Sequence, residues 1–305
     1  MSIKNLINSY INDSENMSSD AKFSLLDRIF FYNSTPIQLA TPTTEGIIVG
    51  KSRAIELNLT QRVMFSEHNI FCRSRKIVTE LQNPTIQDFW EPPVSVASQG
   101  RLNPQGESLL YLADNPLTAV AEIGQPQNGS FMLIFYELIN NTTLTEIGFS
   151  GNNKENDDLL KFLDNLFMKK RDTSQSDGHQ IYEITNYIAK RYKNYGDGWV
   201  YPSTVSNGVN FCLLSSKKIN LNIVASINII NGIFKSKYLF KDKNDIQLIQ
   251  LSEVEAREEW RHLVDLSQKN SFKVPENFEL PNNPAPVVTM LPPAILLPLS
   301  LIVKK

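Results

Sequence analysis

The chain has 305 residues with 41% apolar content, enough for a sizeable buried core in one large domain or two ordinary ones. Its 30 basic and 32 acidic residues leave a formal net charge of −2, so no overall field favours nucleic acid or an anionic membrane. The two cysteines, Cys72 and Cys212, lie in apolar stretches, which favours reduced buried thiols and a cytoplasmic protein.

Apolar periodicity predicts two helices and then two strands in the first part of the chain, over residues 3–12, 20–31, 70–77 and 108–113. The pair Asn115–Pro116 then predicts the start of a short helix, because proline at the first helical position loses no hydrogen bond that the helix needs. Glu122 falls near the end of this helix.

The second part of the chain continues the alternation of helices and strands. Strands are predicted over residues 131–138, 199–201, 210–214 and 219–230. Helices are predicted over residues 155–170 and 180–195, and the capping box Ser252-x-x-Glu255 opens a last helix that runs to residue 268. The apolar tail, residues 287–303, contains three prolines and predicts a buried terminal segment rather than a membrane anchor.

Three separated segments combine turn residues with polar groups, namely residues 100–106, 117–122 and 197–203. They supply Arg101, Glu122 and Ser203. At these residues the chain resembles the RES-domain family, whose members are mostly toxins of bacterial toxin–antitoxin pairs. The motifs that carry the resemblance occur along the chain in the same order as in the family. They are Phe71-Cys72-Arg73, Gly100 to Gly106, Leu110-Tyr111-Leu112-Ala113, Thr118 to Glu122, Asp197 to Ser203 and Asn210.

This resemblance implies an α+β fold, an ADP-ribosyltransferase-like mixed β core with surrounding helices and terminal extensions. We expect an N-terminal helical extension over residues 1–65, the catalytic core over residues 66–230 and a C-terminal extension packed on the core over residues 231–305. The implied enzyme is a NAD+ glycohydrolase or NAD+ phosphorylase, which breaks the nicotinamide–ribose bond by hydrolysis or phosphorolysis. NAD+ is then a consumed substrate and not a cofactor, and phosphate is a potential co-substrate.

The residue types suit this chemistry. The nicotinamide ring already carries a positive charge within NAD+ and needs no protonation to leave, so stabilising the oxocarbenium-like ribose matters more than a strong general acid. Glu122 is expected beside that ribose, as carboxylates are in glycoside cleavage. Arg101 joins it as a catalytic residue that positions the dinucleotide through forked donors, and Ser203 joins it as a hydrogen-bonding group. The predicted substrate-binding residues are Arg73 or Arg75, Asn103, Tyr111 and Asn210.

Plainer interpretations of several of these residues stay open. Tyr111 suits a core tyrosine of a buried strand equally well, and Ser203 after Pro202 suits a simple turn former. His68, His179 and His262 lie far apart without carboxylate or cysteine partners at ligand spacing, so no metal site is expected. The chain has no Gly-x-Gly-x-x-Gly turn and no Walker loop, which argues against redox use of a dinucleotide and against phosphoryl transfer.

By analogy with the family, the expected partners are NAD+ and an Xre-like helix-turn-helix antitoxin, with no direct binding of nucleic acid and no membrane. A homo-oligomer stays open. Two other functions also stay open: a mono-ADP-ribosyltransferase that modifies a protein or nucleic acid on the same scaffold, and a non-catalytic binding module. Retention of Arg101, Glu122 and Ser203 speaks against the binding module.

Overall fold

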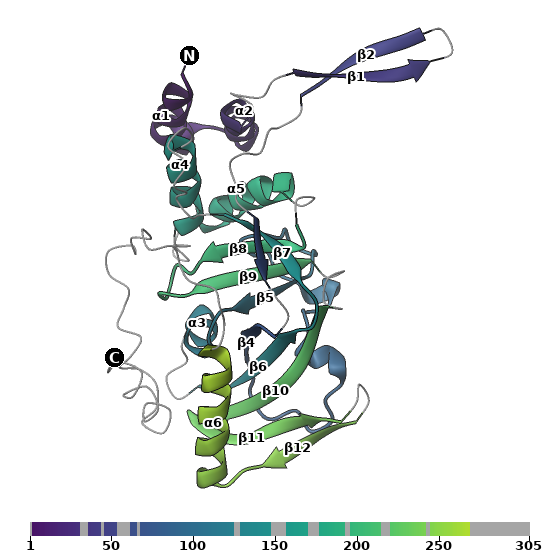
Figure 1. The fold of residues 1–305 in the computed structure, drawn as a ribbon. Coiled ribbons are helices and arrows are strands. Elements are labelled where there is room, and N and C mark those ends of the chain that lie inside the picture. Colours follow the sequence, from purple (N-terminus) through teal and green to yellow (C-terminus); the bar gives the residue numbers. More distant parts are fainter. Residues whose placement is uncertain are drawn as a thin grey trace.

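The computed structural model describes residues 2–30, 36–43, 46–53, 62–65, 68–124, 129–147, 157–169, 177–192, 196–214, 220–241 and 245–268. These residues form a ten-stranded mixed sheet with helices packed against it, and a separate two-stranded sheet (Figure 1). The predicted α+β class with a mixed β core is therefore confirmed.

The strands make one long sheet and one small one. In chain order they are β1 (Pro36–Thr43), β2 (Gly46–Arg53), β3 (Arg62–Phe65), β4 (Ile70–Lys76), β5 (Leu109–Ala113), β6 (Phe131–Leu138), β7 (Thr142–Glu146), β8 (Gly198–Pro202), β9 (Val209–Leu214), β10 (Leu221–Ile230), β11 (Ile233–Phe240) and β12 (Ile246–Gln250). The long sheet has the order β12-β11-β10-β6-β4-β5-β9-β8-β7-β3, and β1 pairs with β2. In the long sheet only β7 and β8 pair in parallel.

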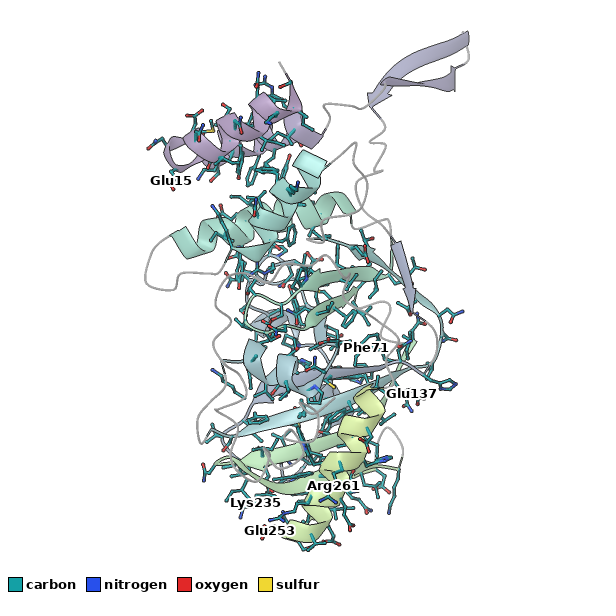
Figure 2. All side chains as sticks on the ribbon, turned by 60° about the vertical axis from the view of Figure 1, so that its left-hand side comes forward. Glu15, Phe71, Glu137, Lys235, Glu253 and Arg261 are labelled. Carbon is teal, nitrogen blue, oxygen red and sulfur yellow. The ribbon has the colours of Figure 1, made fainter. Side chains whose placement is uncertain are left out.

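Helices cover the sheet at two places. They are α1 (Ile3–Asp13), α2 (Ser19–Phe30), α3 (Pro116–Glu122), α4 (Asp157–Met168), α5 (Asp177–Tyr192) and α6 (Glu253–Gln268), with short 3-10 turns η1 (Ser14–Asn16), η2 (Ile86–Phe89) and η3 (Val94–Val96). Helices α1, α2, α4 and α5 share one apolar cluster with β8 and β9, and α3 and α6 share another with β4, β6 and β10. Figure 2 shows Glu15 and Glu253 at opposite ends of the molecule, with Phe71 between them.

Local signals in the sequence explain the element boundaries near the middle of the chain. Asn115 caps α3 by accepting a hydrogen bond from the Thr118 amide at 2.9 Å, and Pro116 occupies the first helical position. The capping box of α6 is formed, since the Ser252 amide and hydroxyl both donate to the Glu255 carboxylate. The helices and strands predicted from residue 70 to residue 230 all occur within a few residues of the predicted limits.

The predicted N-terminal helical extension needs a correction. Residues 3–13 and 19–30 are helical as predicted, but β1, β2 and β3 follow within residues 36–65, so the extension is only partly helical. Isoleucine, valine and threonine recur in β1 and β2, and such β-branched side chains favour a pleated strand. Strands β7, β11 and β12 also lie where no strand was predicted.

The three-part division of the chain stays a prediction. The long sheet continues past residue 230, because β11 pairs with β10 and β12 pairs with β11. Cys72 and Cys212 are free and buried, as predicted. None of the helices in the described residues is long and apolar enough to cross a membrane. The apolar tail at residues 287–303 lies outside the described residues.

The long sheet opens between its two central strands. Strand β4 pairs with β6 from Ile70 to Lys76, and β5 pairs with β9 from Leu109 to Ala113. Between β4 and β5 the only registered pair is Cys72 with Ala113. The two strands therefore meet at one point and diverge, and this divergence positions the site described next.

Candidate active site

A cavity of about 730 Å³ lies where β4 and β5 diverge. Its walls come from both strands, from the loop before β5, from α3 and α5, and from the segment that joins β8 to β9. Arg101 and Glu122, two of the three residues predicted to be catalytic, line this one cavity. Its volume falls within the range of about 300–1,000 Å³ that is typical of small-molecule sites.

Glu122 is the last residue of α3, and two side chains that are distant in the sequence, Ser203 and Asn210, hold its carboxylate. The Ser203 hydroxyl donates to Oε1 at 2.7 Å, and the Asn210 side-chain amide donates to the same oxygen at 2.6 Å. The second oxygen, Oε2, accepts no hydrogen bond from the described residues. One oxygen therefore fixes the carboxylate, while the other keeps its capacity to accept a hydrogen bond from a ligand.

Ser203 follows β8 and is only 1% exposed. While its hydroxyl donates to Glu122, the oxygen accepts hydrogen bonds from the backbone amides of Val205 at 3.2 Å and Ser206 at 3.1 Å. A hydroxyl has one hydrogen to donate and two lone pairs, so these contacts use its full capacity. The geometry thus makes Ser203 a group that positions Glu122, and Ser203 does not itself line the cavity.

The turn after Ser203 is also attached to α3 directly. The Ser206 hydroxyl donates to the Thr118 hydroxyl oxygen at 3.1 Å, and the Gly208 amide donates back to the Ser206 hydroxyl at 3.2 Å. A Cβ atom at Gly208 would overlap the Thr118 hydroxyl oxygen, so only glycine permits this approach. The turn and α3 are therefore fixed to each other, which sets the distance between Ser203 and Glu122.

Arg101 lines the cavity from the loop before β5 and is 9% exposed. Its guanidinium donates to the carbonyl oxygen of Phe167 and, at 3.2 Å, to that of Lys169. These carbonyls belong to the C-terminal end of α4, where a cation is favourable because the helix dipole is negative there. The Arg101 Cζ also lies 5.8 Å from the centroid of the Tyr182 ring. Arg101 therefore ties the loop before β5 to α4 and α5.

Asn103 and Tyr111 hold this same loop in shape. The Asn103 side-chain amide donates to the carbonyl oxygens of Ser98, Pro104 and Glu107 at 2.8–3.0 Å. The Tyr111 hydroxyl donates to Asn103 Oδ1 at 2.6 Å and accepts from the Leu102 amide at 3.0 Å. Both residues line the cavity, but these polar groups are engaged by the chain itself. Their contacts favour positioning roles over the predicted substrate-binding roles.

The structure distinguishes the two arginines of β4. Arg73 lines the cavity, and its guanidinium donates to the Trp90 carbonyl oxygen. Arg75 does not line the cavity, is exposed, and donates to the Asp88 carbonyl oxygen at 2.8 Å. A side chain two residues further along a strand lies about 7 Å away on the same face. Arg73 is therefore the arginine that can contact a ligand in the cavity.

Comparison with known proteins identifies a domain that covers nearly half of the chain. Residues 77–225 match the model of the RES domain. The chain contains a RES domain. None of the curated proteins compared with the chain matches it. A solved structure, the M. tuberculosis MbcT–MbcA toxin–antitoxin complex, aligns with a TM-score of 0.36 and 13% identity over 55% of this chain and 87% of that chain.

The RES domain brings together most residues that the sequence singled out. Arg101, Asn103, Tyr111, Glu122, Ser203 and Asn210 all fall inside residues 77–225, while Arg73 and Arg75 lie just before them. Within the described part of the chain, no group of three or more histidine, cysteine, aspartate or glutamate residues could hold a metal ion. The roles of the individual residues stay proposals.

Sequence reasoning missed Tyr201 of this RES domain. Tyr201 lies on β8 directly opposite Asn210 of β9, lines the cavity and is 5% exposed. Burial raises the pKa of the Tyr201 hydroxyl well above its usual range, and the negative charge of Glu122 raises it further. The motif Asp-Gly-x-x-Tyr-Pro-Ser contains this tyrosine, but the spacing of the motif does not reveal where its hydroxyl lies.

Proposed function

We propose that the RES domain of this chain consumes NAD+ by cleaving the bond between nicotinamide and ribose. The observation that carries the proposal is the Glu122 carboxylate, which Ser203 and Asn210 anchor through Oε1 at the cavity that Arg73 and Arg101 also line. A fixed carboxylate with one unengaged oxygen is suited to a ribosyl group that becomes positively charged.

The reaction breaks the C–N bond between the anomeric carbon and the pyridinium nitrogen. The bonding electron pair leaves with nicotinamide, which becomes neutral, and positive charge develops on the ribose. Glu122 accepts a hydrogen bond from a ribose hydroxyl through Oε2 and offsets this charge, so it contributes more in the transition state than in the ground state. A water oxygen then bonds to the anomeric carbon and releases a proton, or a phosphate oxygen bonds to it and gives ADP-ribose 1''-phosphate.

Two arginines that line the cavity are proposed to bind the pyrophosphate of NAD+. Arg73 and Arg101 line different walls, one on β4 and the other in the loop before β5. Guanidinium groups bind phosphate oxygens through planar forked donors. Arg101 uses donors on two of its nitrogens to bind α4, and a guanidinium has five N–H groups, so it retains donors for a ligand.

In this proposal the enzyme is a cytoplasmic toxin that lowers the NAD+ content of the cell. The support is the RES domain, because the RES-domain family that the sequence resembles consists mostly of toxins of toxin–antitoxin pairs. A restraining partner, an Xre-like helix-turn-helix antitoxin, belongs to the same proposal. Joint expression of such a partner should restore the growth and the NAD+ content of cells that express this chain.

Incubation of the purified protein with NAD+, with and without phosphate, tests the reaction. Mass spectrometry should show release of nicotinamide with either ADP-ribose or, only when phosphate is present, ADP-ribose 1''-phosphate. The Glu122→Gln variant is the matched control and should leave NAD+ unchanged over the same time. An unchanged NAD+ pool with the wild-type protein under both conditions contradicts the proposal. Transfer of label from NAD+ to a protein or nucleic acid would instead identify a mono-ADP-ribosyltransferase.

A further inference from the structure

Tyr201 brings to the cavity a hydroxyl group that the described residues do not use. The Tyr201 side chain is 5% exposed and lines the cavity, yet its hydroxyl makes no hydrogen bond to the described residues. The hydroxyl oxygen is not one of the fully buried atoms that lack a partner, so it reaches the open space of the cavity and can donate a hydrogen bond to a ligand there. Tyr111, the tyrosine nearby on β5, differs in that its hydroxyl already donates to Asn103.

The position of Tyr201 relative to Glu122 follows from strand register. Tyr201 lies directly opposite Asn210, and side chains of directly opposed residues project from the same face of a sheet. Asn210 donates to Glu122 Oε1 at 2.6 Å, so this face carries the carboxylate. The charges of Glu122 and Arg101 both act on the Tyr201 hydroxyl, the former raising and the latter lowering its pKa. The hydroxyl is therefore near Glu122 and Arg101, two of the charged residues that line the cavity.

We propose that Tyr201 is a substrate-contact residue that binds the same ribose hydroxyl as Glu122. That ribose hydroxyl donates its hydrogen to Glu122 Oε2, and its oxygen accepts a hydrogen bond from the Tyr201 hydroxyl. The inference rests on the proposed function. A ribose hydroxyl that gives its proton to a carboxylate still has lone pairs on its oxygen, and it needs a donor to satisfy them. Tyr201 supplies this donor, since burial keeps the phenol protonated at neutral pH.

The contact should act mainly on binding. Glu122 responds to the charge that grows on the ribose, whereas a neutral phenol holds the hydroxyl in place before and during the reaction. Loss of one such hydrogen bond between neutral groups is expected to weaken binding about tenfold. Removal of the hydroxyl should not weaken the fold, because the ring would keep its packing against the apolar cluster around Trp199 and Cys212.

The experiment compares the wild-type chain with Tyr201→Phe, using Tyr111→Phe as the matched control. Tyr201→Phe should raise the KM for NAD+ about tenfold and change kcat much less, with the thermal midpoint unchanged. Tyr111→Phe should lower the thermal midpoint, because it removes two hydrogen bonds within the chain. An unchanged KM in Tyr201→Phe, with an active wild type, overturns the inference and leaves the proposed function intact.

A second measurement removes the partner group from the substrate. Two NAD+ analogues, each lacking one hydroxyl of the nicotinamide ribose, are compared with NAD+ on the wild type and on Tyr201→Phe. With the analogue that lacks the hydroxyl bound by Tyr201, the wild type and Tyr201→Phe should have equal KM values, because the hydrogen bond between Tyr201 and that hydroxyl is already absent. A tenfold difference that persists with both analogues overturns the inference. A wild type that does not consume NAD+ overturns the proposed function and the inference together.

Discussion

The Ser203 hydroxyl donates to the Glu122 carboxylate at 2.7 Å although 81 residues separate the two in the chain. Glu122 ends a helix and Ser203 follows a strand, and the turn after Ser203 is fixed to that helix through Ser206 and Thr118. The carboxylate is therefore oriented by the fold before any ligand binds. Preorganisation of this kind stabilises a transition state without the cost of reorganising the site during the reaction.

Replacing the carboxylate of Glu122 should remove most of the activity. Glu122→Gln keeps the size of the side chain but cannot offset positive charge on the ribose, so kcat should fall by about 100-fold or more with little change in binding. The rate of nicotinamide release and the Kd for NAD+ measure the two effects. Glu137→Gln is the control, because Glu137 bonds to His68 and does not line the cavity. A Glu122→Gln protein with the wild-type rate would contradict the role.

Loss of the Ser203 hydroxyl should act through Glu122. Ser203→Ala removes one of the two donors to Oε1, and we expect kcat to fall about tenfold because the carboxylate is less well held. The double variant with Glu122→Gln should be no slower than Glu122→Gln alone, since both changes affect one interaction. A fully additive loss would show that Ser203 acts independently. Ser252→Ala, which removes a helix cap, should reduce stability and leave kcat unchanged.

The two arginines of β4 should differ in their effect on substrate. Arg73→Ala removes a guanidinium from the cavity, and we expect the KM for NAD+ to rise about tenfold or more because a charged donor to phosphate is lost. Arg75→Ala removes an exposed side chain paired with Asp88, so its KM should stay within about twofold of the wild type. Steady-state kinetics in low salt measure both. The reverse order of effects would assign the ligand contact to Arg75.

Arg101 should contribute to stability as well as to binding. Its guanidinium bonds two carbonyl oxygens at the end of α4, which the single ammonium of lysine cannot match in geometry. Arg101→Lys should lower the free energy of unfolding by about 1.5–3 kcal/mol, as measured by denaturant titration. Arg257→Lys, at an exposed ion pair on α6, should change it by less than about 0.5 kcal/mol. If Arg101→Lys and Arg257→Lys had equal free energies of unfolding, the hydrogen bonds from Arg101 to α4 would not stabilise the fold as predicted.

Both thiols should be unreactive in the folded protein. Burial raises the pKa of the Cys72 and Cys212 thiols well above the usual range. A raised pKa keeps the thiols protonated at pH 8, and only the thiolate is a nucleophile. Ellman's reagent at pH 8 should therefore detect almost no thiol in the native chain and two per chain after denaturation. Rapid reaction of Cys72 without unfolding would show that the cavity admits reagents to the surface of β4.

Local patterns in the sequence identify much of the fold. The cap at Asn115, the proline at the start of α3 and the capping box of α6 act within a few residues, so the sequence alone predicts these helix ends. Strand β7 was missed because Thr142–Glu146 is short and largely polar, and its place in the sheet depends on pairing with β3 and β8. Strands β11 and β12 likewise depend on successive addition to β10.

The site was predictable in its residue types and less so in its contacts. The order of motifs indicated that Arg101, Glu122 and Ser203 belong together, and the shared cavity contains the first two. The sequence did not reveal that Ser203 serves the carboxylate, or that Asn103 and Tyr111 bind each other. These contacts arise from strand register across the sheet, as does the opposition of Tyr201 and Asn210, and register is not encoded in local spacing.

The single registered pair between β4 and β5 affects how a site of this kind can change its ligand. The strands that border the gap are each held by their other neighbour, since β4 pairs with β6 over its whole length and β5 pairs with β9. New specificities are therefore expected to arise at loop residues that line the cavity and are at least partly exposed, Pro92, Ser98, Thr204 and Val205, where a change of side chain leaves the strand pairing and the contacts of Arg101 and Ser203 intact.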